Sequence, residues 1–197
     1  FHSGKAGNAC TFSNACFRTN IETRQHDVNS ATEHADNAIK FLRGHGGDKP
    51  FFIYLAPPVP HDPRLAPPEF VKLYDPAKVT LSKNFMPEHP FDNGELKVRD
   101  EMLAAHPRTA EEMRRHVADY YATVSHLDHE VGRVLDAVRE RDWADNTVVI
   151  FSSDQGLAVG GRHGPAARRH AHALQRHGPS LPRAASAADR ESRNRRC

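Results

Sequence analysis

Two short apolar runs, each preceded by a segment of helical periodicity, limit the folds open to this chain more than any other feature. The runs are "KPFFIYL" at 49–55 and "NTVVIFSS" at 146–153, and both are rich in aromatic or β-branched residues. A continuous apolar run of this length is typical of a strand that is buried on both faces of a sheet. Because helical segments alternate with such strands, the sequence predicts the α/β fold class.

The first helical segment lies just before the first apolar run. Ser30 and Glu33 have the spacing of a capping box, and apolar residues then recur at helical intervals. Gly44 suits the end of a helix, because glycine readily adopts the left-handed conformation found there. Together these features predict a helix over 31–43.

The second helical segment is much longer. Thr109 and Glu112 form another capping box, which precedes an apolar stripe that steps by three or four residues. The stripe consists of Met113, Val117, Tyr120, Val124, Leu127, Val131, Leu135 and Val138. We expect one amphipathic helix over 110–140 with this stripe as its buried face. Histidines of the same segment share no face with carboxylates, so we interpret them as solvated or capping groups: His116, His126 and His129.

Two stretches favour irregular structure. Residues 1–27 are rich in Asn, Thr and Ser, which is typical of loops with one short strand. Residues 56–108 are rich in proline, which removes backbone donors and fixes the φ angle, so we expect no more than a short helix at "PPEFVKLY".

The composition changes after Gly164. Residues 165–197 contain no Val, Ile, Met, Phe, Tyr, Trp or Lys, so they have too little apolar surface to offset the entropy of ordering. We therefore predict one domain over 1–164 and a disordered, basic, low-complexity tail over 165–197. The tail is either a basic arm for nucleic acid or acidic lipid, or the product of a frameshift in GC-rich DNA. The second interpretation is favoured, since Ala, Arg, Pro and Gly have GC-rich codons.

The whole chain carries a formal net charge of only +2, so we expect no nucleic-acid partner. No stretch approaches the roughly 20 apolar residues of a membrane-spanning helix, and no signal peptide is visible. Because the chain does not open with Met, we expect its beginning to be missing. The three cysteines form no CxxC pair, so neither a zinc ribbon nor a disulfide framework is indicated.

Polar side chains follow both predicted strands at their carboxyl ends, where ligands gather in open α/β sheets. Asp154 and Gln155 offer two oxygen donors after the second strand, which suits a hard cation such as Ca²⁺ or Mg²⁺. The same residues are equally typical of a turn in which the aspartate accepts backbone hydrogen bonds. Taken alone, the turn is the more frequent explanation.

Two basic side chains are also candidates for a site. His61 lies in "PVPHDPR", where prolines on both sides restrict its backbone, so the imidazole is preorganised to contact an anion or to protonate a leaving group. Lys5 lies between glycines in "HSGKAGN", where the backbone can approach an oxyanion closely. The alternatives are a surface-loop histidine and a solvated lysine.

Taken together and in order, these segments resemble the sulfatases of the alkaline phosphatase superfamily, especially bacterial arylsulfatases and choline sulfatases. The resemblance rests on "GK" near the start, "KPFFIYLAPPVPHDPR", "FMPEHPFDNGELKVRDEML", "YYATVSHLDHEVGRVLDAV" and "NTVVIFSSDQGLAVGGRHG", and covers residues 1–164. It implies a mixed sheet sandwiched by helices, of which this chain holds an incomplete part. The complete enzyme would cleave small sulfated substrates and, by resemblance, would be exported or periplasmic.

The resemblance also implies roles for individual residues. Asp154 matches the acidic ligand of a divalent metal, most often Ca²⁺, and Gln155 occupies a neighbouring ligand position. His61 matches the histidine that contacts the sulfate and its leaving-group oxygen. Lys5 matches a sulfate-binding lysine. The nucleophile of the family is a formylglycine made from Cys or Ser.

The chain departs from the family pattern in several places. The Cys/Ser-x-Pro-x-Arg motif that yields formylglycine is absent, as are the paired aspartates that complete the metal site and a later "GK" lysine, and Gly7 replaces a histidine. We therefore expect the middle of a sulfatase, truncated upstream and frameshifted downstream, which is inactive as it stands. A phosphodiesterase or phosphonate hydrolase of the same superfamily remains an alternative, and so does a non-catalytic fragment with a basic binding tail.

Overall fold

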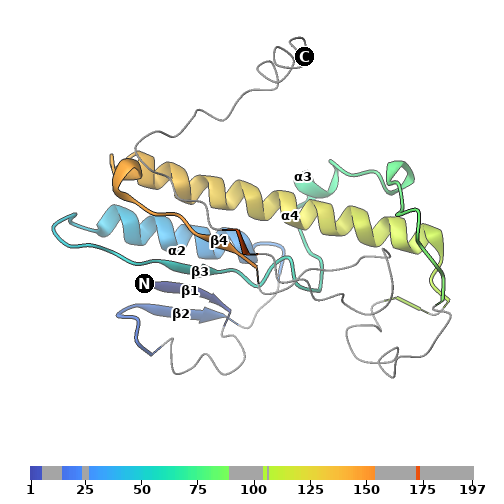
Figure 1. Cartoon of the computed structure of the whole chain (residues 1–197), viewed down its shortest axis with the longest axis horizontal. Helices are drawn as coiled ribbons and strands as arrows, with labels where there is room; N and C mark the ends of the chain where they lie inside the picture. Colours follow the sequence, from blue (N-terminus) through green and yellow to red (C-terminus); the bar gives the residue numbers. More distant parts are fainter. Residues whose placement is uncertain (6–14, 24–26, 89–103, 106, 154–171, 174–197) are drawn as a thin grey trace, which may run out of the picture.

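The computed structural model describes residues 1–5, 15–23, 27–88, 104–105, 107–153 and 172–173. Its strands are β1 (His2–Lys5), β2 (Asn20–Thr23), β3 (Tyr54–Ala56), β4 (Phe151–Ser152) and β5 (His172–Ala173). Its helices are α2 (Ser30–Gly44), α3 (Pro68–Val71) and α4 (Ala110–Arg139), with 3₁₀ turns at Pro76–Lys78 and Ala144–Asn146. Helix α2 lies beside the long helix α4 and also contacts β1 and β3 (Figure 1). The α/β class is confirmed.

The first three strands form a parallel sheet in the order β2-β1-β3. Gly4 pairs with Ala56 of β3, and the two backbones approach each other very closely there. A Cβ atom on Gly4 would lie 2.1 Å from the Ala56 carbonyl oxygen, and the φ angle of Gly4 is +153°. Only glycine fits this position, because a side chain would both clash and adopt an unfavourable φ.

Helix α2 starts one residue earlier and ends one residue later than predicted. The expected capping box at its start is wrong, because Ser30 is already helical and its hydroxyl contacts the backbone N–H and the carboxylate of Asp27. The backbone N–H of Glu33 donates instead to the Asn29 carbonyl, 2.9 Å away. The turn before α2 is thus stabilised by contacts of Asp27 with Ser30, and these contacts take the place of the predicted cap.

The predicted helix over 110–140 is confirmed as α4, which ends one residue earlier. The side chain of its N-cap, Thr109, accepts a hydrogen bond from the Glu112 backbone N–H at 3.1 Å. The predicted buried stripe is correct only at its two ends. Val124 in the middle is 38% exposed, whereas Ala118, Ala122, Thr123, His126 and Glu130 are buried. The buried face therefore turns toward small and polar residues, which allow α4 to lie close to α2.

The two apolar runs differ from the prediction in both length and burial. Strand β3 is only three residues long and includes just Tyr54 and Leu55 of the first run. Phe52 and Tyr54 are 67% and 46% exposed. In the second run, Ile150 and Phe151 are also mostly exposed. The expectation of strands buried on both faces was therefore wrong for the described residues. Helix α2 contacts the sheet of β1 and β3, whereas β4 belongs to a separate two-stranded sheet with β5.

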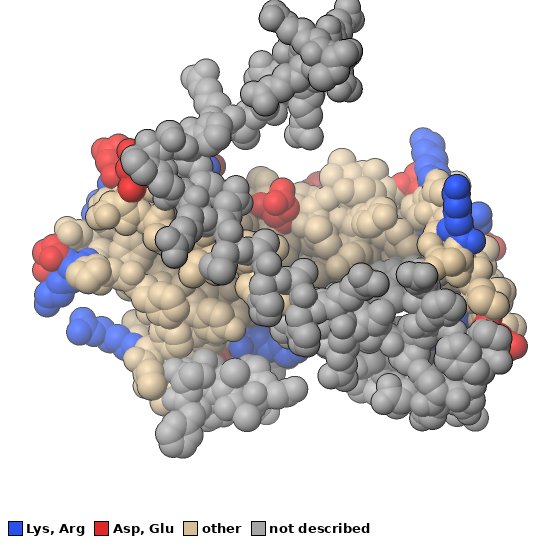
Figure 2. Space-filling model, in the orientation of Figure 1, with Lys and Arg blue, Asp and Glu red and all other residues tan. Residues whose placement is uncertain are grey.

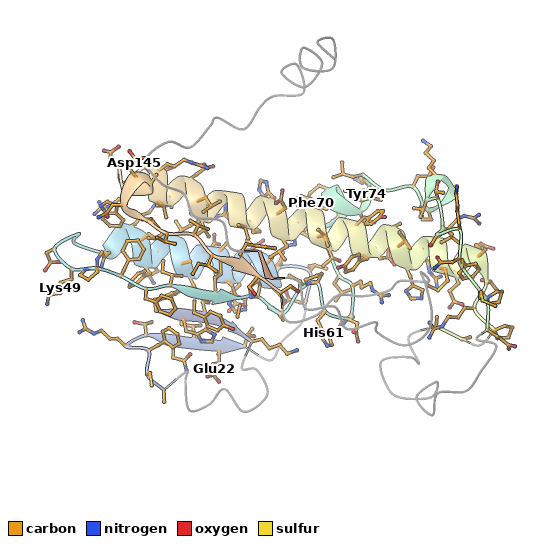
Figure 3. The ribbon with its side chains drawn as sticks, viewed as in Figure 1. Glu22, Lys49, His61, Phe70, Tyr74 and Asp145 are labelled. Atoms are coloured by element: carbon orange, nitrogen blue, oxygen red, sulfur yellow. The ribbon has the colours of Figure 1, made fainter. Side chains whose placement is uncertain are left out.

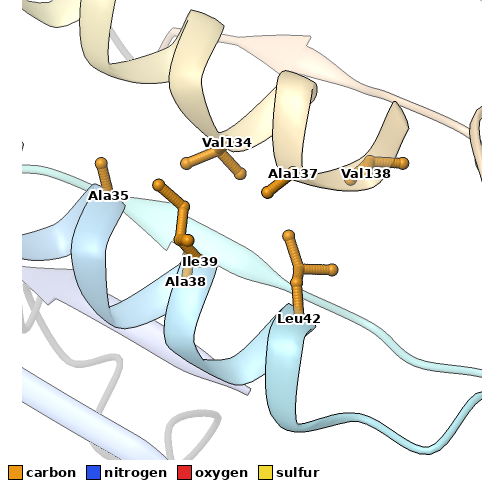
Figure 4. Packing of buried hydrophobic residues seen from close by; sticks show 7 residues of the cluster. All are labelled: Ala35, Ala38, Ile39, Leu42, Val134, Ala137 and Val138. Atoms are coloured by element: carbon orange, nitrogen blue, oxygen red, sulfur yellow. The ribbon is translucent and has the colours of Figure 1, made fainter. Parts of the chain in front are cut away.

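The apolar core lies between α2 and α4 (Figure 4). It consists of Ala35, Ala38, Ile39, Leu42, Val134, Ala137 and Val138. Aromatic and aliphatic side chains from the sheet side, including Phe1, Phe51 and Ile53, pack against it. Small residues on both helices let the two backbones approach each other, so the core contains few large side chains. The stability of the fold therefore depends strongly on each of them.

The surface and the remaining segments add three observations. On the face shown in Figure 2, basic and acidic side chains of the described residues are interspersed rather than gathered into one basic area. No helix among the described ranges is long and apolar enough to span a bilayer. Apart from the short strand β5, the predicted tail lies outside the described residues, so its disorder stays a prediction.

Candidate functional site

The two basic site candidates lie at the same edge of the parallel sheet. Lys5 is the last residue of β1 and is exposed. His61 follows the carboxyl end of β3, which pairs directly with β1 (Figure 3). Because parallel strands bring their carboxyl ends together, the fold places both candidates on the side where α/β sheets bind ligands.

His61 is held by its own loop. Its backbone N–H donates to the Pro58 carbonyl at 3.2 Å. Its Nδ1 lies 2.9 Å from the Asp62 carbonyl oxygen and 3.2 Å from the Asp62 carboxylate. Since both neighbours of Nδ1 are acceptors, Nδ1 carries a proton and the ring orientation is fixed. These contacts orient the ring within its loop, and the role of His61 as a preorganised site residue stays a prediction.

A buried polar contact supports the strand that ends in Lys5. Ser3 and His34 are both fully buried, and the Ser3 hydroxyl lies 2.7 Å from His34 Nδ1 on α2. Asn37 adds a longer hydrogen bond to the same hydroxyl, at 3.4 Å. These contacts fix the register of β1 against α2, so Lys5 starts from a rigid backbone. The sequence did not indicate this pair, because a serine in a loop-like stretch and a histidine on a helix have no diagnostic spacing.

Helix α4 contributes a second buried histidine, and the expectation that His126 is solvated was wrong. The ring is 1% exposed, and its Nε2 lies 2.9 Å from the Thr32 hydroxyl, which in turn donates to Glu130 at 3.0 Å. Arg133 bonds both Glu130 and Asp36, so the network joins α2 to α4. His126 thus serves the packing of the two helices.

These buried histidines predict that stability falls at acidic pH. Burial lowers the pKa of His34 and of His126 from the ordinary value of 6.5, and the neighbouring Glu33 and Glu130 raise it only in part. The unfolded chain therefore takes up protons near pH 6.5 that the folded chain does not. Stability should be full above pH 6.5 and should decrease as the pH falls below it, as urea unfolding at several pH values would show.

Single variants can assign this pH dependence. His34→Gln and His126→Gln should each make the decline in stability less steep, because the titrating ring is gone. Equal slopes in the wild type and in both variants would show that burial of these rings does not cause the decline.

Comparison with known proteins decides the family. A sequence model described as Sulfatase matches residues 6–185, which is most of the chain. The chain belongs to the sulfatase family. The match continues beyond Gly164 into the segment that we separated as a tail, and the division at that residue stays a prediction.

Individual sulfatases agree with this assignment, and one hydrolase of known structure shares the fold. Human iduronate 2-sulfatase is 33% identical over 135 residues, which are 60% of this chain and 24% of that protein. An arylsulfatase of Clostridium perfringens is 32% identical over 64% of this chain and 26% of that protein. The crystal structure of a phosphonate monoester hydrolase of Agrobacterium radiobacter shares the fold, with a TM-score of 0.58, 20% identity and coverage of 74% and 32%. This sulfatase-family chain thus spans about a quarter of the length of the curated relatives it matches.

The predicted metal ligands of this sulfatase lie outside the described residues. Asp154 and Gln155 follow directly after Ser153, the last described residue beyond β4. Their oxygen donors have the chemistry that a hard cation prefers, but Ca²⁺ takes six to eight ligands and two residues supply too few. Within the described ranges, no group of three or more His, Cys, Asp or Glu could hold a metal ion. The calcium site therefore stays a prediction.

The nucleophile of a sulfatase is likewise not found in the described part. Cys16 is an exposed cysteine followed by Phe-Arg-Thr, not by the spacing that yields formylglycine. Cys10 and Cys197 lie outside the described residues. The candidate site that can be described thus consists of Lys5 and His61.

Proposed function

We propose that this chain contributes the sulfate-binding edge of a sulfuric ester hydrolase that acts on small sulfated substrates. The observation that carries the proposal is the placement of Lys5 and His61 beyond the paired strands β1 and β3. Family membership supports the reaction class, and the relatives' own substrates are not transferred to this chain.

In this proposal each residue has a defined task. The Lys5 ammonium contacts a sulfate oxygen as a flexible point charge. His61, oriented through Nδ1 by Asp62, faces the ester oxygen with Nε2 and delivers a proton as the bond to sulfur breaks. Preorganisation matters here, because an alkoxide leaving group needs its proton donor already in position.

Groups beyond these two would complete the reaction. Asp154 and Gln155 would hold part of the coordination of a divalent cation, with Ca²⁺ favoured and Mg²⁺ as the alternative. Such a cation would neutralise negative charge on the sulfate. A formylglycine, which the described residues do not supply, would serve as the nucleophile of the complete enzyme.

Binding of inorganic sulfate to the full chain tests this proposal. We expect Lys5→Ala and His61→Ala each to weaken sulfate binding by roughly tenfold, because each removes a charge-assisted contact. Chemical-shift titration measures the affinity without requiring turnover. Lys49→Ala is a matched control, since Lys49 is exposed and lies at the left end of the molecule, away from His61 (Figure 3).

The same titration distinguishes the alternatives. Affinity for sulfate that does not change in either variant would contradict the assigned roles. A clear preference for inorganic phosphate over sulfate would favour the phosphodiesterase or phosphonate hydrolase alternative. Salt-sensitive binding of nucleic acid that is lost on deletion of 165–197 would favour the basic-tail alternative.

A further inference from the structure

Arg64 is a largely buried cation that lies three positions after His61 in the same loop and has an unusual partner. Its Nη1 lies 2.8 Å from Nδ1 of His116 on α4. Its Nε is buried and has no hydrogen-bond acceptor among the described residues. No carboxylate of the described part forms an ion pair with it. An arginine in this situation needs an explanation, because a buried N–H without an acceptor costs stability.

The partner of Arg64 is a neutral acceptor. Guanidinium can only donate, so His116 Nδ1 must be unprotonated. Burial lowers the pKa of His116, and the charge of Arg64 lowers it further, which is consistent with a neutral ring. His116 therefore orients the guanidinium without cancelling its positive charge.

The geometry of guanidinium leaves one edge available. With Nη1 directed at His116, the edge that carries Nε–H and an Nη2 proton points elsewhere. This is an edge that can form two parallel hydrogen bonds with a carboxylate or sulfate. The unsatisfied Nε–H thus belongs to the edge of the guanidinium group that is suited to bind an anion through two hydrogen bonds. We call this Nε–H and Nη2 edge the fork.

The charged side chains of the described residues do not occupy that fork. Burial lowers the pKa of Arg64, whereas Asp62 and Asp119 raise it from a distance and Arg108 lowers it. Asp62 is already engaged with the ring of His61. Arg108 adds a second positive charge to the same neighbourhood, which increases the attraction for an anionic group.

We propose that Arg64 forms an anion-binding subsite next to His61, which accepts a second acidic group, a carboxylate or another sulfate, on the body of a sulfate ester. The inference rests on the proposed function, because His61 would hold the sulfate that is cleaved. It goes further by assigning the substrate class: sulfate esters with at least two anionic groups.

A pair of esters that differ only in one carboxylate tests the subsite. The full chain should bind 4-carboxyphenyl sulfate roughly tenfold more tightly than phenyl sulfate, because one bidentate charge-assisted contact is added. Arg64→Gln should remove this preference and leave the affinity for phenyl sulfate unchanged. Arg64→Lys should keep only part of the preference, since it retains the charge but loses the fork. Arg115→Gln, an exposed arginine next to His116, is the matched control.

An NMR experiment on the wild-type chain tests the subsite without depending on whether a variant folds. The Arg64 Nε–H resonance, followed by NMR, should shift on titration with 4-carboxyphenyl sulfate and with benzoate. Absence of a shift with both compounds, or equal affinity of the wild type for the two esters, would overturn the subsite. A shift with benzoate in a protein that does not bind phenyl sulfate would leave the subsite standing and reject the proposed sulfate site.

Discussion

Gly4→Ala should lower the free energy of unfolding by at least about 3 kcal/mol, which is near the upper range for single substitutions. The new Cβ would lie 2.1 Å from the Ala56 carbonyl oxygen and 2.4 Å from its carbonyl carbon. Both are backbone atoms, so the clash is relieved only if β1 moves away from β3. A φ of +153° adds strain for any residue with a side chain. Urea unfolding followed by circular dichroism measures the loss.

Gly132→Ala is the matched control for this substitution. Gly132 lies within α4, and no atom lies within 4 Å of the Cβ that alanine would add. Because alanine favours helices more than glycine does, we expect a gain of up to about 1 kcal/mol. A Gly4→Ala protein as stable as the wild type would contradict the close pairing of β1 and β3.

Leu42→Ala should cost about 2–5 kcal/mol of unfolding free energy, the range for large-to-small substitutions in a packed core. Leu42 is 0% exposed, and it is the largest fully buried side chain of the described residues. Small residues surround it on both helices, so they cannot expand to fill the space that the substitution would leave. Chemical denaturation with an unchanged m-value would show that stability, not the unfolded state, has changed.

Leu73→Ala provides the comparison for this prediction. The Leu73 side chain is 64% exposed, so its removal should change stability by less than about 0.5 kcal/mol. Similar losses for the two variants would mean that the cluster between α2 and α4 is not the main apolar core.

The periodic parts of the fold were predictable because their pattern depends on local geometry. Helix α4 followed from its capping threonine and its repeating apolar residues. Helix α2 followed from its repeating apolar residues, although its predicted cap was wrong. Burial was harder to predict, since it depends on which elements lie opposite. The sequence of 49–55 indicated a strand, but the exposure of Phe52 follows from the absence of a covering layer among the described residues.

The site shows the same division between local and tertiary information. The position of His61 could be read from its prolines and from the end of the apolar run. Lys5 was a candidate because it lies between glycines, and the resemblance to sulfatases then implied its role. The contact between Arg64 and His116 joins residues 52 positions apart, and no local pattern indicates it. Strand β1 was missed as a defined strand because its pairing with β3 spans a similarly long separation.

The pairing of β1 with β3, across the intervening helix, also has a consequence for biosynthesis. The N-terminal strand can find β2 early, but its second neighbour leaves the ribosome only after α2 has been made. The contact of Thr32 with Glu130 spans 98 positions, so α2 lacks this partner until α4 has been synthesised. Contacts between residues so far apart in the sequence slow folding, and apolar surface stays exposed until both partners have been synthesised. We therefore expect the nascent chain to need protection by a chaperone until α4 has been synthesised.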